Sequence, residues 1–208
     1  MSAVSLAERQ QRNGVSYMYR LLTDKIKQYI QVKNNDIHLI EALFRERILA
    51  KGDLFLQEGK LCRELGFINK GLVCYHVLTD GNKLVHNFAK ENEFVCNFDS
   101  LIKKTASQKN IMALERTELL VISWDQLQRL YTTMSNGEKF GRLLMEEVYT
   151  DAIKHIISFY TESPQKRYNE FVEKHKELAL RVPQYYIASF IGVKPQSLSR
   201  IRKRMMTS

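Results

Sequence analysis

The chain of 208 residues is 44% apolar and carries a formal net charge of +9. This length suits one large domain or two small ones, and enough apolar side chains are present to bury a core, which excludes a disordered chain. Cys62, Cys74 and Cys96 form no C-x-x-C pair and have no histidine at zinc spacing, so we interpret them as buried free thiols. The sequence shows neither a signal peptide nor an apolar run of about 20 residues, which predicts a cytoplasmic protein.

The positive charge is concentrated near the C-terminal end of the sequence. Residues 164–208 hold ten Lys and Arg against three Glu, a net charge of +7, and the rest of the chain carries only +2. Basic charge confined to one segment favours a nucleic-acid partner. A basic solvated face without a partner is the alternative.

Apolar residues at helical spacing between Tyr17 and Leu43 predict one or two short helices. The polar residues before them, Met1 to Asn13, are expected to fray. From Arg47 onward, short β-rich runs are punctuated by glycine, which predicts an antiparallel sheet or roll.

Two hairpins are predicted within this β-rich region. Asp80-Gly81 separates two alternating runs, so we expect a tight turn in a hairpin from Leu72 to Ala89. A second strand pair is expected from Asn110 to Leu114 and Glu118 to Ser123.

After Trp124 the apolar spacing becomes helical and predicts one helix of about 25 residues. Pairing of this helix with a second copy of itself would hold two C-terminal segments at a set distance. Packing on its own β domain is the alternative. Ser163-Pro164 then ends the helix, because proline cannot continue the hydrogen-bond ladder. The predicted dimer stripe consists of Phe140, Leu144, Val148, Ala152, His155 and Phe159.

Residues 183–204 have the pattern of a helix-turn-helix that ends on a basic helix. Two short helices cross steeply only if the first presents a small residue at the crossing and the turn permits an unusual backbone conformation. Ala188 and Gly192 occupy those positions. Pro195 suits the first turn of the second helix, where its missing N–H has no consequence.

The order of these elements resembles the Crp/Fnr family of bacterial transcription regulators. The resemblance covers Tyr19 to Arg204 and is carried by three stretches, residues 47–59, residues 67–71 and residues 187–201, with Pro164-x-x-Arg167-Tyr168 upstream of the last. It implies an α+β fold with an N-terminal antiparallel β-roll of the cyclic-nucleotide-binding jelly-roll type, a long dimerisation helix and a helical DNA-binding domain. The corresponding boundaries are residues 1–135, 136–163 and 164–208.

The resemblance also implies a homodimer that binds double-stranded DNA with a two-fold symmetric operator and, if it activates transcription, contacts RNA polymerase. Only four residues follow Arg204, so we expect no full β-wing and expect DNA contacts to concentrate on the helix. Relatives that sense through an iron-sulfur cluster need a cysteine cluster, which this sequence lacks.

In relatives that bind cyclic nucleotides, a Gly-Glu pair opens the phosphate cassette and an Arg-Ser pair closes it. Here Lys109-Asn110 stands where Arg-Ser would fall, and lysine lacks the planar fork that grips a phosphate. We therefore expect no binding of cyclic AMP and leave open another small-molecule effector or a ligand-free scaffold. The residues expected to line a ligand pocket are Phe94, Val95, Asn97, Lys109 and Asn110.

By alignment to the recognition helix of the family, Gln196, Ser197 and Arg200 face the major groove. Arg200 suits guanine through O6 and N7, and Gln196 suits adenine through N6 and N7. An ion pair or phosphate contact is the alternative role for Arg200. The residues expected to contact phosphates are Ser189, Lys194, Arg202, Lys203 and Arg204.

An enzyme and an interaction module are the two alternative classes of function. The sequence contains no His-x-His, Gly-x-Ser-x-Gly, phosphate loop or Rossmann pattern, so we predict that the protein is not an enzyme. A small-molecule sensor or interaction module that no longer reads DNA is the second alternative. The Ala188 and Gly192 spacing and the local charge of +7 argue against it.

Overall fold

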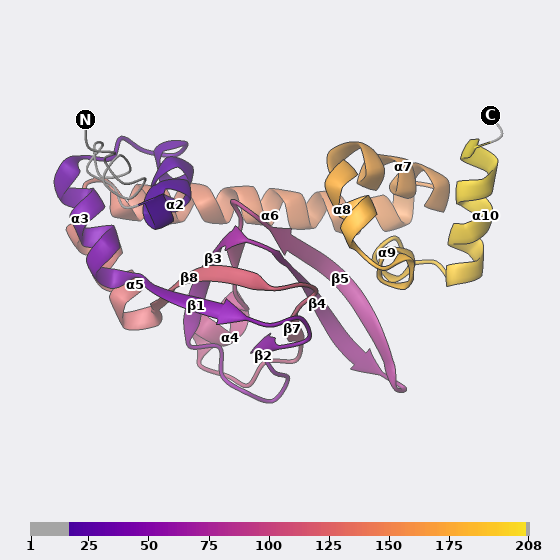
Figure 1. Ribbon diagram of the computed structural model, residues 1–208, viewed down its shortest axis with the longest axis horizontal. Coiled ribbons are helices and arrows are strands. Elements are labelled where there is room, and N and C mark those ends of the chain that lie inside the picture. The colour runs from indigo at the N-terminus through magenta and orange to yellow at the C-terminus, as the bar shows by residue number, and fades with distance from the viewer. Residues whose placement is uncertain (1–16, 207–208) are drawn as a thin grey trace, which may run out of the picture.

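The computed structural model describes residues 17–206, so the expectation for Met1 to Asn13 lies outside the described residues. The described part of the chain begins with two helices, α2 (Tyr17–Lys27) and α3 (Asn34–Leu43), as the apolar spacing predicted. They lie at one end of the molecule, and the C-terminal helices lie at the other end, with the β-strands between and below them (Figure 1). Within residues 17–206, no helix is both long and apolar enough to cross a membrane.

Between Tyr17 and Met206, eight strands form two four-stranded antiparallel sheets, which confirms the predicted α+β fold with a β-roll. In the first sheet the order is β1 (Arg45–Leu49), β8 (Thr117–Ser123), β3 (Glu64–Lys70) and β6 (Phe94–Val95). In the second sheet the order is β2 (Leu54–Leu56), β7 (Asn110–Ala113), β4 (Leu72–Thr79) and β5 (Asn82–Lys90).

The predicted hairpin is present as β4 and β5, with Thr79 paired to Asn82 across the turn. Asp80 has a φ of 50° and Gly81 a φ of 76°, and two positive values at the centre of a two-residue turn match the strand twist. The second predicted pair is wrong as a pair: β7 and β8 both exist, but β7 joins β2 and β4 whereas β8 joins β1 and β3. The chain crosses from one sheet to the other between them.

The interior of the roll is filled by apolar side chains of both sheets and of the N-terminal helices. Leu22 and Ile26 on α2 and Ile40 on α3 are fully buried in this cluster, so these two helices cap the roll. Apolar burial of this kind stabilises a fold by about 25 cal/mol for each Å² of apolar surface removed from water.

The remaining helices follow the roll and carry the chain to its C-terminal domain, which we define as residues 164–206. Helix α6 has 25 residues, as predicted, and ends just before Ser163-Pro164. The Ser163 Oγ accepts a hydrogen bond from the Lys166 N–H, so a new helix begins at Pro164. These helices are α4 (Phe98–Lys103), α5 (Trp124–Thr133), α6 (Gly137–Thr161), α7 (Pro164–Lys174), α8 (Lys176–Arg181), α9 (Gln184–Phe190) and α10 (Pro195–Met206).

Candidate nucleic-acid interface

Helices α9 and α10 form a helix-turn-helix. Ala188 is fully buried on α9, and its carbonyl accepts a hydrogen bond from the Val193 N–H at 2.9 Å. Gly192 has a φ of +74°, and a Cβ added there would lie 2.6 Å from Cε1 of Phe159. The turn therefore needs glycine both for its backbone conformation and for the close approach of α6.

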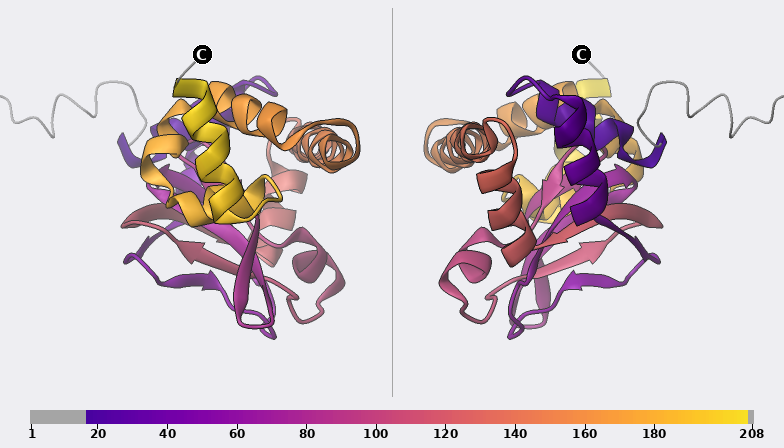
Figure 2. Two further views of the ribbon diagram at one scale, coloured as in Figure 1. Left: turned by 90° about the vertical axis from the view of Figure 1, so that its right-hand side faces the viewer. Right: turned by 90° about the vertical axis from the view of Figure 1, so that its left-hand side faces the viewer.

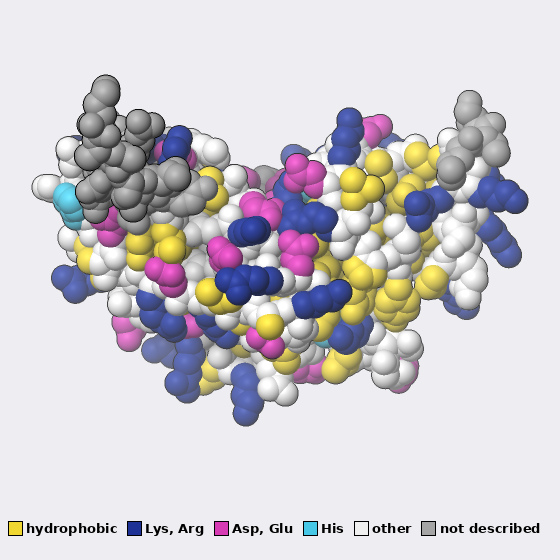
Figure 3. Space-filling view, in the orientation of Figure 1, with side chains coloured by type: hydrophobic (Ala, Val, Ile, Leu, Met, Phe, Trp, Pro, Cys, Tyr) yellow, Lys and Arg dark blue, Asp and Glu magenta, His cyan; other side chains and the backbone are white. Residues whose placement is uncertain are grey.

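Helix α10 packs through one narrow stripe and exposes the rest of its surface. Leu198 and Ile201 are 1% and 9% exposed and face α9. Viewed from this end of the molecule, α10 lies foremost (Figure 2, left), and basic side chains project from the same end (Figure 3). The exposed polar residues of α10 are Gln196, Ser197, Ser199, Arg200, Arg202, Lys203 and Arg204.

Seven of the eight residues predicted to contact DNA are exposed in or next to α10. Lys194 lies in the turn before the helix, and Ser197 and Arg200 line a shallow hollow between α10 and the start of α7. Ser189 is placed differently, because its Oγ accepts a hydrogen bond from the Val85 N–H of β5 at 2.8 Å. That hydroxyl is used inside the chain, so we do not include Ser189 among the proposed DNA contacts.

Arg167 connects the end of α6 to the helix-turn-helix. Its Nη1 donates to the Glu162 carbonyl at 2.6 Å, its Nε donates to the Ile191 carbonyl at 3.0 Å, and its guanidinium lies 4.8 Å from the centre of the Phe159 ring. One side chain thus holds the last turn of α6, α7 and the turn after α9 together. The sequence pointed to Arg167 only as part of a family-like motif and gave no role for it.

Only part of the predicted dimer stripe on α6 is buried against the chain itself, and Phe159 at its far end is 42% exposed. Phe140 and Leu144 are 1% and 4% exposed and belong to the core of the roll. Farther along, the His155 ring stacks on Phe190 at 4.5 Å, and Phe159 packs against Gly192 and Arg167. Of the six predicted residues, Val148 and Ala152 are exposed without such packing.

A different face of α6 is apolar and open. Tyr149, Ile153, Ile156 and Tyr160 are 66%, 36%, 52% and 86% exposed. Their spacing of four, three and four residues is that of a coiled-coil seam. A free apolar stripe of this length on a helix is typical of a surface that meets a partner helix.

The five residues expected to line a ligand pocket are instead mostly part of the packed interior. The Phe94 ring packs 5.1 Å from Phe67, and Val95 is fully buried. The Asn97 amide donates to Ser107 Oγ at 2.9 Å, and the Asn110 side-chain oxygen accepts from the Glu58 N–H at 2.9 Å. Lys109 is half-buried at the end of the loop between α4 and β7.

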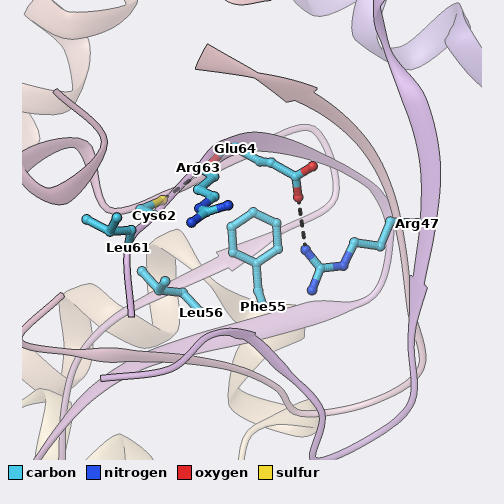
Figure 4. Close-up of a pocket in the computed structure, with 7 residues that line it drawn as sticks. All are labelled: Arg47, Phe55, Leu56, Leu61, Cys62, Arg63 and Glu64. Carbon is cyan, nitrogen blue, oxygen red and sulfur yellow. Dashed lines mark hydrogen bonds and ion pairs between the residues drawn. The ribbon is translucent and has the colours of Figure 1, made fainter. Parts of the chain in front are cut away.

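A hollow of about 330 Å³ opens elsewhere, between the ends of β1, β2 and β3 (Figure 4). The Arg47 guanidinium points to the Glu64 carboxylate at 3.2 Å and lies 5.1 Å from the centre of the Phe55 ring. Arg47 is therefore ion-paired within the hollow, with a carboxylate that it shares with Arg45. The hollow is lined by Arg47, Phe55, Leu56, Leu61, Cys62, Arg63 and Glu64.

The three cysteines are buried free thiols, as predicted. A hydrogen bond from Cys96 lowers the pKa of the Cys62 thiol to about 7 in spite of its burial, and backbone groups of Asn97 and Glu64 act in the same direction. Burial raises the pKa of the Cys96 thiol well above its usual value. The pKa of the Cys74 thiol is raised to about 12, also by burial.

Comparison with known proteins agrees with this architecture. Residues 46–134 match the family model of the cyclic nucleotide-binding domain. No curated protein matches the chain.

Several solved structures share the fold over most of the chain. FixK2 from Bradyrhizobium japonicum is 15% identical, covers 79% of this chain and 85% of its own, and has a TM-score of 0.69. The c-di-GMP responsive global regulator CLP from Xanthomonas campestris is 17% identical, covers 84% and 92%, and has a TM-score of 0.65. A transcriptional regulator of the crp/fnr family from Eubacterium rectale is 14% identical, covers 86% and 88%, and has a TM-score of 0.65.

The roll is thus a domain of the cyclic-nucleotide-binding type, joined by a long helix to a helix-turn-helix. The fold expected from the resemblance to the Crp/Fnr family is confirmed, since the chain shares the fold of these solved regulators.

Proposed function

We propose that this protein is a sequence-specific DNA-binding transcription regulator that binds a two-fold symmetric operator as a homodimer in the cytoplasm. The observation that carries the proposal is α10, which begins at a proline, packs through Leu198 and Ile201, and exposes Gln196, Ser197 and Arg200 together with a basic end. A helix of this kind enters the major groove with base-contacting residues near its N-terminus. Arg202, Lys203 and Arg204 then lie nearer the end of the helix, where phosphates flank the groove.

A binding titration against salt tests the DNA-binding part of this proposal. Bound fragments of genomic DNA should resist unlabelled competitor DNA at about 0.15 M salt, and the affinity should fall steeply as salt rises. A sensor or interaction module that no longer reads DNA would show no preference over the competitor. That result would overturn the proposal.

We propose further that the two copies meet along the seam formed by Tyr149, Ile153, Ile156 and Tyr160. We place the seam beside the stripe expected from the sequence, because Phe140 and Leu144 of that stripe are buried in the roll and His155 stacks on Phe190. Parallel pairing of the two seams would place the two C-terminal domains side by side, as a two-fold operator requires.

The β-roll is proposed not to bind cyclic AMP. The position where family members place an arginine for the cyclic phosphate holds Lys109, and the amides of Asn97 and Asn110 are hydrogen-bonded to Ser107 and to Glu58. Millimolar cyclic AMP should therefore leave the thermal unfolding midpoint unchanged, since only a ligand that binds the folded state raises it. A dose-dependent rise would contradict this part of the proposal. Cyclic di-GMP belongs in the same assay, because the similar regulator CLP is described as responsive to it.

A further inference from the structure

The outer face of the second sheet is apolar and is covered by the C-terminal domain. This face belongs to the same buried cluster as Tyr168 and Phe171 of α7, Leu178 of α8, Ile187 of α9 and Ile191, which directly follows α9. If the C-terminal domain moved away, the sheet would expose a contiguous apolar patch, so the docked arrangement is favoured. The covered residues are Leu72, Cys74, Val85, Phe88 and Met112 of the sheet and Leu114, which directly follows β7, all between 0% and 9% exposed.

The first helix of the helix-turn-helix makes the contact with β5. The Phe88 ring lies 5.3 Å from Phe190, and the Val85 N–H donates to Ser189 Oγ. Because α9 and α10 are locked to each other at Ala188, a fixed α9 also fixes the direction in which α10 points.

Apolar contacts are not directional, whereas Arg181 supplies a contact with a set geometry. Its guanidinium donates to both oxygens of Glu91, at 3.0 and 2.8 Å, and to both oxygens of Glu115. Glu91 also accepts the Gly71 N–H at 2.8 Å, which ties this carboxylate to the backbone of the roll. Two bidentate pairs on one guanidinium define both position and orientation.

The docked arrangement leaves the DNA-facing side of α10 uncovered. Gln196, Ser197 and Arg200 are exposed while Arg181, on α8, is 25% exposed and holds the opposite side of the domain against the roll. The contact therefore orients the recognition helix and does not mask it.

We propose that Arg181 is a positioning residue for DNA recognition. By pairing with Glu91 and Glu115 it holds α10 at one place relative to α6, so that the two recognition helices of a dimer keep the separation of the two half-sites. This inference rests on the proposed function, because it concerns how the same interface meets its operator.

The test compares Arg181→Ala with Arg116→Ala in the full-length protein. Arg116 is a matched control, since it follows Glu115, carries the same charge and pairs with Glu118 on the surface of the roll. The DNA probes are the consensus recovered by selection from random fragments, two versions with half-site spacing changed by two base pairs, and a single half-site.

The wild type and Arg116→Ala should bind the consensus far better than the respaced probes. Arg181→Ala should bind the consensus about tenfold more weakly than the wild type and bind the half-site equally well. It should also distinguish poorly between the half-site spacings, because the two recognition helices of a dimer with loosened domains no longer have a preferred separation. Glu115→Gln leaves Glu91 as a partner for Arg181. Its affinity for the consensus and its preference for the correct spacing should therefore lie between those of the wild type and of Arg181→Ala. A merely structural role for Arg181 would lower binding to all probes equally and leave the spacing preference intact, which would overturn the proposal.

Exchange of the Val85 amide proton provides a readout without DNA. It should be faster in Arg181→Ala than in the wild type or Arg116→Ala, since the hydrogen bond to Ser189 opens when the domain undocks. Unchanged exchange would overturn the positioning role, and tighter operator binding by Arg181→Ala would do so as well. Failure of the wild type to prefer any DNA sequence would instead overturn the proposed function itself. The exchange measurement needs no DNA, so it shows separately whether Arg181 holds the C-terminal domain on the roll.

Discussion

At the scale of single residues, the structure explains why glycine and alanine stand where they do in the helix-turn-helix. Gly192 needs a positive φ and leaves no room for a Cβ beside Phe159, and Ala188 is fully buried at the crossing. The small residue at the crossing and the unusual backbone conformation of Gly192 were predicted from the sequence, because they depend on local backbone geometry, whereas the approach of Phe159 was not. The contact of Ser189 with Val85 was not predicted, because its partner lies 104 positions away in the chain.

Replacing Gly192 should destabilise the protein more than replacing a glycine with free space around it. Gly192→Ala combines strain at positive φ with a clash against Phe159 and should lower the free energy of unfolding by about 2 to 4 kcal/mol. Gly81→Ala is the control, since Gly81 has a φ of +76° but nothing within 4 Å of an added Cβ, and should lower it by about 1 kcal/mol. Chemical denaturation measures both, and equal losses would contradict the steric argument.

Arg200 should determine base preference, whereas Lys194 should contribute only charge. Arg200→Ala should weaken binding to the best operator by about 1 to 3 kcal/mol and relax specificity at one base position, because a bidentate contact to guanine is lost. Lys194→Ala should weaken binding to all sequences alike and reduce the slope of log affinity against log salt concentration by about one. Binding assays over operator variants separate the two effects, and an equal loss on operator and random DNA for Arg200→Ala would show that it reads no base.

At the scale of elements, local patterns predicted which strands and helices exist but not always their partners. β7 and β8 were recognised from β-rich runs, yet they lie in different sheets because strand pairing depends on the course of the whole chain. The length of α6 was predicted, but its outward face was not. Apolar residues at helical spacing occur on two neighbouring faces, and only the packing of Phe140 and Leu144 into the roll shows which one is occupied.

The open face of α6 gives a direct test of the dimer. Ile156→Glu places a charge in the centre of the seam and should turn a dimer into a monomer at micromolar concentration, because an unpaired charge cannot be buried between two helices. Thr150→Glu adds the same charge on the exposed helix but off the seam and should leave the dimer intact. Sedimentation velocity measures the mass of both variants. A monomeric wild type, or dissociation of both variants alike, would argue against the seam.

At the scale of the whole molecule, the C-terminal domain is docked on the roll and does not hang from a free hinge. The sequence indicates this arrangement in one place, since Leu72 to Tyr75 form a run with apolar side chains on both faces of a strand. Both faces of β4 are indeed buried, one by the interior of the roll and the other by the C-terminal domain. The identity of the covering element could not be predicted, because it is brought there only by the fold of α6 and α7.

Docking should make the protein sensitive to acid. His155 stacks flat on Phe190, and burial, together with Arg167, lowers the pKa of its ring. The unfolded chain then binds a proton at higher pH than the folded chain does, so the free energy of unfolding should fall as pH drops from about 6.5 through the lowered pKa. Denaturant unfolding at a series of pH values should show a weaker fall in His155→Phe than in the wild type, with exposed His38→Phe as control. An identical fall in His155→Phe would exclude His155 as a source of this dependence.

The central claim, that two copies of α10 read DNA from a fixed platform, is tested most directly by selecting bound fragments from random DNA with the full-length protein. The expected result is one consensus with two-fold symmetry and half-sites about one helical turn apart, which would establish sequence reading and pairing in the same measurement. Enrichment of a single half-site would contradict the dimer, and recovery of fragments without any consensus would contradict a DNA-reading function.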